Sequence, residues 1–218
     1  MLMRHKMRGY LVLVALGGGS FCFGQSWSIG AAGGFGFYHD ATFTNAAGSA
    51  NAGFRPRFAA GAVLGEDVSE HFGGELRYTY RDGDSELKFN GREANLDAAS
   101  HAVHFDFLAY ATRRHSRLRP FLAGGAGIKR YTATGREDPN QPLNNFALLA
   151  HANEVKALVS FGGGLKAVLG DHWLVRVDFR DYATPFPENV IVPATGAKIH
   201  GWLHDFVPLF GVDWTFGR

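Results

Sequence analysis

The chain has 218 residues, enough for one domain of substantial size, and combines 19% charged residues with 14% aromatic residues and 29 glycines. Its formal net charge of +2 becomes −1 when Arg4, Lys6 and Arg8 are removed with an N-terminal segment, so the charge balance gives no reason to expect a nucleic-acid partner. The single cysteine, Cys22, lies in the same segment, which excludes a disulfide framework in the rest of the chain.

Residues 1–24 have the pattern of a secretory signal peptide. A basic start is followed by a short apolar run at 10–16 and by small residues that suit cleavage after Gly24. A lipoprotein acylated at Cys22 is the alternative, but Phe21 stands where that signal needs a small residue. A retained transmembrane helix is disfavoured because a span needs about 20 apolar residues.

The remaining chain, 25–218, alternates apolar and polar residues with a period of two, which is the signature of strands that separate two environments. The connections between the expected strands alternate between long and short, and Asn90-Gly91 in one long connection predicts a tight hairpin. We expect eight strands, at 26–38, 54–65, 72–81, 102–111, 120–131, 155–167, 173–180 and 202–216.

The last expected strand, 202–216, shows the pattern most clearly. One face carries aromatic and apolar residues such as Trp202 and Phe210, whereas the other face includes Asp205 and Asp213. A lipocalin-like soluble barrel would turn the apolar face inward. Eight strands enclose too little space for so many large rings, so the apolar faces are expected to meet lipid. The four tryptophans are expected near the strand ends, as interfacial residues: Trp27, Trp173, Trp202 and Trp214.

The C-terminal residues Gly211, Trp214 and Phe216 resemble the assembly signal that ends bacterial outer-membrane barrels, although Leu209 replaces its polar residue and Gly217-Arg218 follow it. From its second strand onward, the mature chain resembles small eight-stranded outer-membrane proteins of the OmpA transmembrane-domain and opacity type. The resemblance implies an all-β, antiparallel up-and-down transmembrane barrel in the cell outer membrane. It also implies insertion by the barrel-assembly machinery, contact with outer-membrane lipid and a monomer.

The polar faces carry charges of both signs. The expected interior set is Arg55, Arg57, Glu75, Arg77, Arg81, Asp106, Lys129, Lys156, Lys166, Arg176, Asp178, Arg180, Asp205 and Asp213. One interpretation is a selective pore. The favoured interpretation is an ion-pair network that fills the barrel, because a buried charge needs a partner.

Other motifs give little support for catalysis or for a metal or cofactor site. His104 and Asp106 share one strand face, whereas His204 and Asp205 are adjacent and point to opposite sides. No nucleophile stands at the spacing used by outer-membrane enzymes, so we expect no enzyme and no cofactor.

Two polar segments outside the expected strand faces could touch ions or lipid. The acidic segment 82–86 lacks the glycine and distal glutamate of a calcium loop, so it is expected to be a solvated loop rather than a metal site. The basic turn 113–119 is expected either to touch anionic phospholipid heads or the cell wall, or to be an ordinary solvated turn.

Two functions remain open from the sequence. The first is a structural or surface-interaction barrel whose outer loops meet an unidentified ligand or surface. The second is a small porin or transporter. The first, with a plugged and charge-lined interior, is the favoured prediction, and the porin is the alternative.

Overall fold

The computed structural model describes residues 26–46, 48–138 and 140–216, so the expected signal peptide, Cys22 and Gly217-Arg218 lie outside the described residues. The described residues contain no helix that is both long and apolar enough to cross a membrane.

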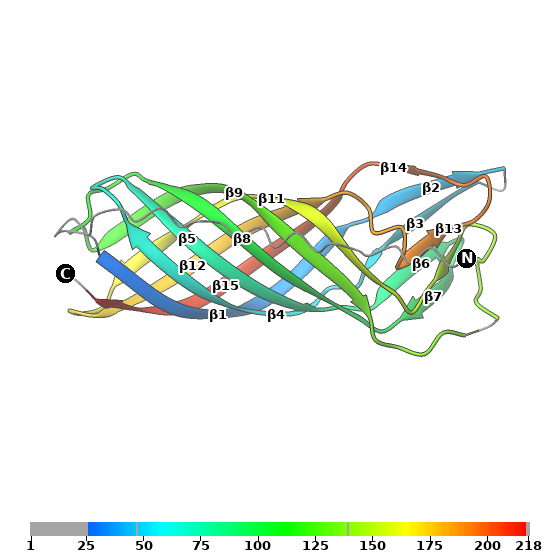
Figure 1. The fold of residues 1–218 in the computed structure, drawn as a ribbon, viewed down its shortest axis with the longest axis horizontal. Coiled ribbons are helices and arrows are strands. Elements are labelled where there is room, and N and C mark those ends of the chain that lie inside the picture. Colours follow the sequence, from blue (N-terminus) through cyan, green and yellow to red (C-terminus); the bar gives the residue numbers. More distant parts are fainter. Residues whose placement is uncertain (1–25, 47, 139, 217–218) are drawn as a thin grey trace, which may run out of the picture.

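Eight long antiparallel strands close into a barrel in the order β1-β15-β12-β11-β9-β8-β5-β4 (Figure 1). The first and last strands close the wall by pairing with each other, with Ala31 opposite Val212. The barrel strands are β1 (Ser26–His39), β4 (Arg57–Asp67), β5 (Phe72–Asp82), β8 (Ala98–Tyr110), β9 (Leu118–Ala133), β11 (Asn153–Val168), β12 (Trp173–Thr184) and β15 (Leu203–Phe216).

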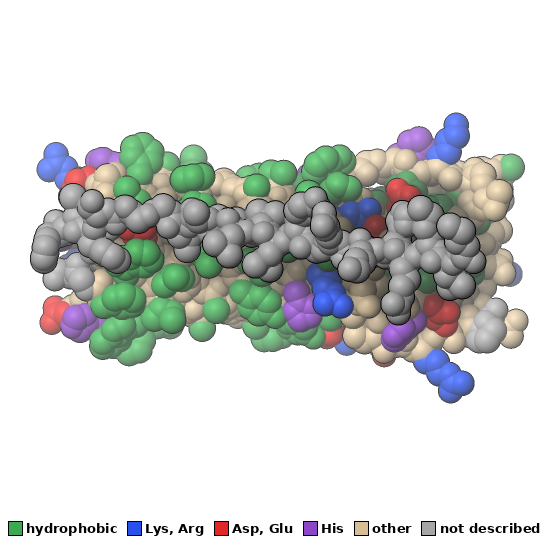
Figure 2. Space-filling view, in the orientation of Figure 1, with side chains coloured by type: hydrophobic (Ala, Val, Ile, Leu, Met, Phe, Trp, Pro, Cys, Tyr) green, Lys and Arg blue, Asp and Glu red, His purple; other side chains and the backbone are tan. Residues whose placement is uncertain are grey.

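The alternation along each strand sorts apolar side chains outward and polar side chains inward, as the sequence predicts. On β8, Phe105 and Phe107 are exposed whereas His104 and Asp106 are buried. Figure 2 shows hydrophobic side chains gathered over the barrel and fewer of them toward the end that carries the long connections. An apolar outer band of this kind is what a membrane-spanning barrel needs.

The long connections extend the barrel at one end as two small sheets, whereas three short turns join the strands at the other end (Figure 1). One sheet has the order β14-β2-β3-β6-β7 and the other pairs β10 with β13. Their strands are β2 (Ala41–Asn45), β3 (Gly48–Phe54), β6 (Ser85–Phe89), β7 (Arg92–Leu96), β10 (Ala147–Leu149), β13 (Ile191–Pro193) and β14 (Lys198–His200).

The predicted hairpin at Asn90-Gly91 is present between β6 and β7. Both residues have positive φ angles, 48° and 75°, which is the geometry that a two-residue turn between twisted strands requires. Asparagine and glycine tolerate this region better than other residues, which explains why the dipeptide is a reliable signal.

An apolar core lies inside the end of the barrel that carries the long connections, beyond the charged part of the lumen. We call this end the outer end and the end with the short turns the inner end. Phe43 and Phe146 are fully buried there, and the rings of Phe54 and Tyr131 stack with centroids 5.2 Å apart. The core combines residues from β2, β3, β6, β7 and β10 and from the 186–191 segment. Barrel strands β8, β9 and β15 add residues at their ends: Ala98, Tyr131, Ala133 and Leu203. The long connections therefore form a folded cap, which we call the outer cap (residues 40–56, 83–97, 134–152 and 185–202).

The expected start of the second strand is wrong, and this changes which residues reach the lumen. The second strand, expected at 54–65, begins at Arg57, and Phe54 belongs to β3 of the outer cap. Pro56 lies between the two strands and has no backbone N–H to donate to a ladder, so regular pairing is interrupted there. Arg55 and Arg57 consequently lie at the outer rim.

Candidate functional site in the barrel interior

Glu75 on β5 is the carboxylate with the most cationic partners in the interior. Its Oε2 atom accepts hydrogen bonds from Arg77 Nη1 and Arg176 Nη2, both at 2.9 Å. Its Oε1 atom lies 2.7 Å from Lys166 Nζ. The side chain is 1% exposed, so these cations are the groups that replace water around its charge.

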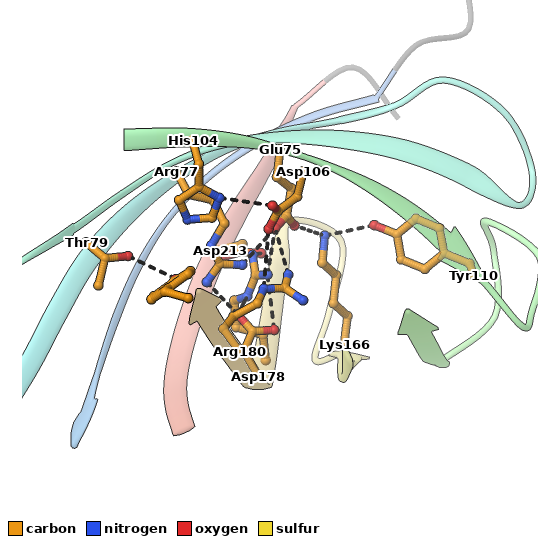
Figure 3. Close-up of polar contacts among 12 residues, drawn as sticks. Glu75, Arg77, Thr79, His104, Asp106, Tyr110, Lys166, Asp178, Arg180 and Asp213 are labelled. Atoms are coloured by element: carbon orange, nitrogen blue, oxygen red, sulfur yellow. Dashed lines mark hydrogen bonds and ion pairs between the residues drawn. The ribbon is translucent and has the colours of Figure 1, made fainter. Parts of the chain in front are cut away.

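Two aspartates extend the network across the lumen to β12 and β15. Asp178 accepts hydrogen bonds from Arg176 Nε at 2.9 Å and from Arg77 Nη2 at 2.8 Å. Asp213 accepts a bond from Arg176 Nη1 at 3.1 Å. Arg176 therefore links three carboxylates. Figure 3 shows Glu75, Asp178 and Asp213 converging from different walls of the barrel.

His104 and Arg180 form the next part of the network. His104 Nδ1 lies 2.9 Å from Asp106 Oδ1, and its ring meets the ring of Tyr182 edge-on at 5.0 Å between centroids. Arg180 is fully buried and makes longer ion pairs, 3.4 Å to Asp106 and 3.8 Å to Glu75. Tyr182 also contacts the hydroxyl of Thr79 at 3.3 Å.

A second cluster lies between this network and the outer cap. Lys129 Nζ donates to Asp205 at 2.6 Å and to the hydroxyl of Tyr38 at 3.0 Å. Arg81 lies 3.3 Å from the same aspartate. Gly36 leaves space for this arginine, because a side chain there would overlap the guanidinium.

A third cluster lies toward the short turns. Lys166 donates to the hydroxyl of Tyr110 at 2.9 Å, and the guanidinium of Arg119 stacks on the same ring at 3.8 Å from its centroid. Arg119 also donates to Asp67 at 2.6 Å. Ion pairs and tyrosine contacts thus extend along the lumen from the short turns to the outer cap.

The charges inside the barrel nearly balance. Seven cations are almost fully buried: Arg77, Arg81, Arg119, Lys129, Lys166, Arg176 and Arg180. They face five buried carboxylates, namely Glu75, Asp106, Asp178, Asp205 and Asp213, with Asp67 as a sixth at the inner end.

The structure places two residues of the expected interior set, Arg55 and Arg57, outside the lumen. Arg55 donates to Glu86 at 2.7 Å and Glu93 at 2.9 Å in the outer cap, and the bond to Glu86 raises the pKa of Arg55. Arg57 pairs with Asp84 at 2.7 Å at the rim.

Lys156 lies on the inward face but is 21% exposed and pairs with Glu154 at 2.8 Å, apart from the central network. The remaining residues of the set lie in the interior: Glu75, Arg77, Arg81, Asp106, Lys129, Lys166, Arg176, Asp178, Arg180, Asp205 and Asp213.

The acidic segment 82–86 is not the solvated loop that the sequence predicts. Asp84 and Glu86 are 7% and 5% exposed and bind the two rim arginines, because β6 brings them beside Arg55 and Arg57. Among the described residues, no group of three or more acidic, histidine or cysteine side chains could hold a metal ion.

Sequence reasoning missed Arg119 as an interior residue because it assigned that position to the basic turn. β9 begins at Leu118, two residues earlier than expected, and Arg119 shares the inward face with Lys129. Counting every second residue from Lys129 toward the start of β9 reaches Arg119, so the alternation would have identified Arg119 as inward-facing.

The closed wall, the apolar exterior and the alternation of long and short connections together define the fold of a small eight-stranded outer-membrane barrel. The sequence matches no protein-family model and no curated protein.

Solved structures with a similar arrangement of strands include the N-terminal β-barrel domain of Pseudomonas aeruginosa OprF (13% identity, TM-score 0.47), which covers 88% of this chain and 97% of that one. Neisserial surface protein A has 11% identity and a TM-score of 0.49 over 88% and 97% of the two chains. The outer membrane protein AlkL has 14% identity and a TM-score of 0.49 over 87% and 90%.

Proposed function

We propose that this chain is an outer-membrane barrel with a closed lumen, which presents its outer cap to the cell exterior for a structural or surface-interaction role. The observation that carries the proposal is the buried ion-pair network around Glu75, which connects β5, β11, β12 and β15 across the lumen. A solute would have to break these pairs to pass.

The outer surface of the barrel supports a location in the membrane. Phe35, Phe107 and Leu122 are 68%, 72% and 72% exposed, which is an unfavourable arrangement in water and a favourable one in lipid. Trp173 and Trp214 pack at 4.8 Å near the ends of their strands, where indole rings suit a membrane interface.

The energetics of the interior support closure. An unpaired buried charge costs several kcal/mol, so paired side chains resist separation by water or a passing ion. The apolar core of the outer cap adds a second barrier, because ions do not cross a dry apolar layer readily. The porin alternative would require both barriers to move.

His104 and Asp106 fit a structural role better than a catalytic one. The pair is buried inside the closed wall, its two side chains 2% exposed or less, and the imidazole packs on Tyr182. We assign this pair to the lumen network and propose no enzymatic activity.

The aromatic residues at the end of β15 are predicted to be needed for assembly into the outer membrane. Phe216 and Trp214 are 44% and 39% exposed on the lipid face of β15, in the aromatic places of the assembly signal. Replacing either residue by aspartate should sharply lower the amount of protein in the outer membrane, measured by immunoblot of membrane fractions. Near the interface the direct lipid cost of a charge is only about 0–1 kcal/mol, so a large loss would reflect recognition by the assembly machinery.

Arg218→Ala is the matched control for this prediction, and it should leave the membrane level unchanged. Equal levels for all three variants would contradict an assembly role for the aromatic residues.

Cysteine labelling in intact cells tests location and orientation together. Arg92 lies beside the β6–β7 hairpin of the outer cap and Arg117 lies in a short turn, and both are exposed. We expect a membrane-impermeant maleimide to label Arg92→Cys in intact cells and Arg117→Cys only after the outer membrane is opened. Labelling of both in intact cells, or recovery of the protein in the soluble periplasm, would contradict the proposal.

A further inference from the structure

Two apolar hollows lie beside each other in the lipid-facing wall near the short turns. The lining of the larger hollow, about 380 Å³, includes Trp27, Glu66, Val68, Gly74, Phe105 and Phe107. The lining of the smaller hollow, about 220 Å³, includes Phe72, Phe107, Ala109, Leu122 and Gly124. Phe107 lines both, so its ring forms a ridge between them.

The register of the strands explains this shape. Phe107 on β8 lies opposite Gly74 on β5 and opposite Gly124 on β9. A large ring with a glycine on each neighbouring strand leaves a hollow on either side. A side chain at Gly74 would meet the ring of Phe105, so the larger hollow depends on that glycine.

A basic turn follows β8 shortly after Ala109, which lines the smaller hollow. The turn between β8 and β9 carries Arg113 and Arg117, which are both exposed, and Arg114. The guanidinium of Arg114 donates to the carbonyl of Asp67 at 2.7 Å, and its backbone N–H donates to Glu70 at 3.3 Å. The basic turn is thereby fixed beside the turn that carries Val68, at the mouth of the larger hollow.

We propose that this region binds one diacyl phospholipid of the inner leaflet, with phosphatidylglycerol favoured over a zwitterionic headgroup. The two acyl chains lie on either side of Phe107, and the phosphate lies against Arg113 and Arg117. The inference rests on the membrane location proposed above. Apolar hollows that face lipid are filled by acyl chains, and basic residues at the membrane surface attract anionic headgroups.

Two short turns supply a matched pair of variants. The backbone N–H of Val68 bonds to the carbonyl of Phe72 at 3.0 Å, and that of Leu169 bonds to Trp173 at 2.9 Å, so both residues begin equivalent turns. Both side chains are exposed, 59% and 68%. Val68→Trp fills the larger hollow, whereas Leu169→Trp adds the same ring at a turn outside both hollows.

Native mass spectrometry of the refolded barrel in neutral detergent, titrated with phosphatidylglycerol, tests the site. We expect one retained lipid on the wild type and on Leu169→Trp, and weaker retention on Val68→Trp. The double variant Arg113→Ala/Arg117→Ala should weaken retention on the order of tenfold, because each basic residue near an anionic headgroup contributes appreciably. Lys198→Ala, which removes an exposed charge from the outer cap, should have no effect.

Equal retention by all variants, or equal retention of phosphatidylethanolamine and phosphatidylglycerol by the wild type, would overturn the inference. Heat-dependent gel migration confirms that each variant is a folded barrel, so loss of folding cannot imitate loss of the site. If lipid retention fails the test while intact cells are labelled at Arg92→Cys and not at Arg117→Cys, the lipid site is refuted and the proposed membrane location stands. An open conductance with intact lipid retention would refute the closed lumen alone.

Discussion

Glu75→Gln should destabilise the folded barrel by about 3–5 kcal/mol, because it removes the charge that compensates the buried cations Arg77, Lys166 and Arg176. Glutamine keeps the size of the side chain, so the effect reports charge rather than packing. Urea unfolding of the protein in lipid vesicles, followed by tryptophan fluorescence, measures the change as a lower midpoint.

Glu93→Gln is the matched control for this substitution. Glu93 pairs with Arg55 at 2.9 Å but its side chain is 46% exposed, and exposed pairs contribute about 0–1 kcal/mol. A midpoint for Glu75→Gln no lower than that of Glu93→Gln would mean that water already screens the lumen charges, and closure by ion pairs would then be wrong.

Phe43→Ala should destabilise the outer cap without destabilising the barrel wall. Phe43 is fully buried and its ring meets that of Phe186 at 5.3 Å, so truncation leaves a cavity at a cost of about 3–5 kcal/mol. Limited proteolysis should cut the outer cap faster, and hydrogen exchange should rise in β2 and β3, while heat resistance of the barrel persists.

Phe35→Ala provides the comparison for the outer cap. Phe35 is 68% exposed on the lipid face of β1, so its truncation creates no cavity in the protein interior. Faster cleavage of the outer cap in Phe35→Ala, or no change in Phe43→Ala, would contradict a role for Phe43 in holding the outer cap together.

The barrel could be predicted from the sequence because each strand separates two environments and alternates accordingly. β15 is an example: Phe210 and Trp214 alternate with Leu209 and Asp213, and the structure places the two groups on opposite sides of the wall. Alternation over more than ten residues is repeated in most barrel strands, so single exceptions do not obscure it.

The outer cap could not be predicted in the same way because its strands are short. β2 has only five residues, and its buried positions are Ala41 and Phe43, too few to distinguish a strand from a polar connection. Their burial depends on contacts with β3 and the 186–191 segment, which are distant in sequence. In the lumen, the alternation along β12 predicts that Arg176 points inward. It does not predict which carboxylates Arg176 binds, because two of the three lie on other strands.

The conductance of purified protein in a planar lipid bilayer tests the closed lumen most directly. The network around Glu75, the cluster of Lys129, Arg81 and Asp205, and the apolar core of the outer cap predict no lasting conductance in ordinary salt. Stable and reproducible single-channel steps from the wild-type protein would contradict the closed lumen and favour a small porin.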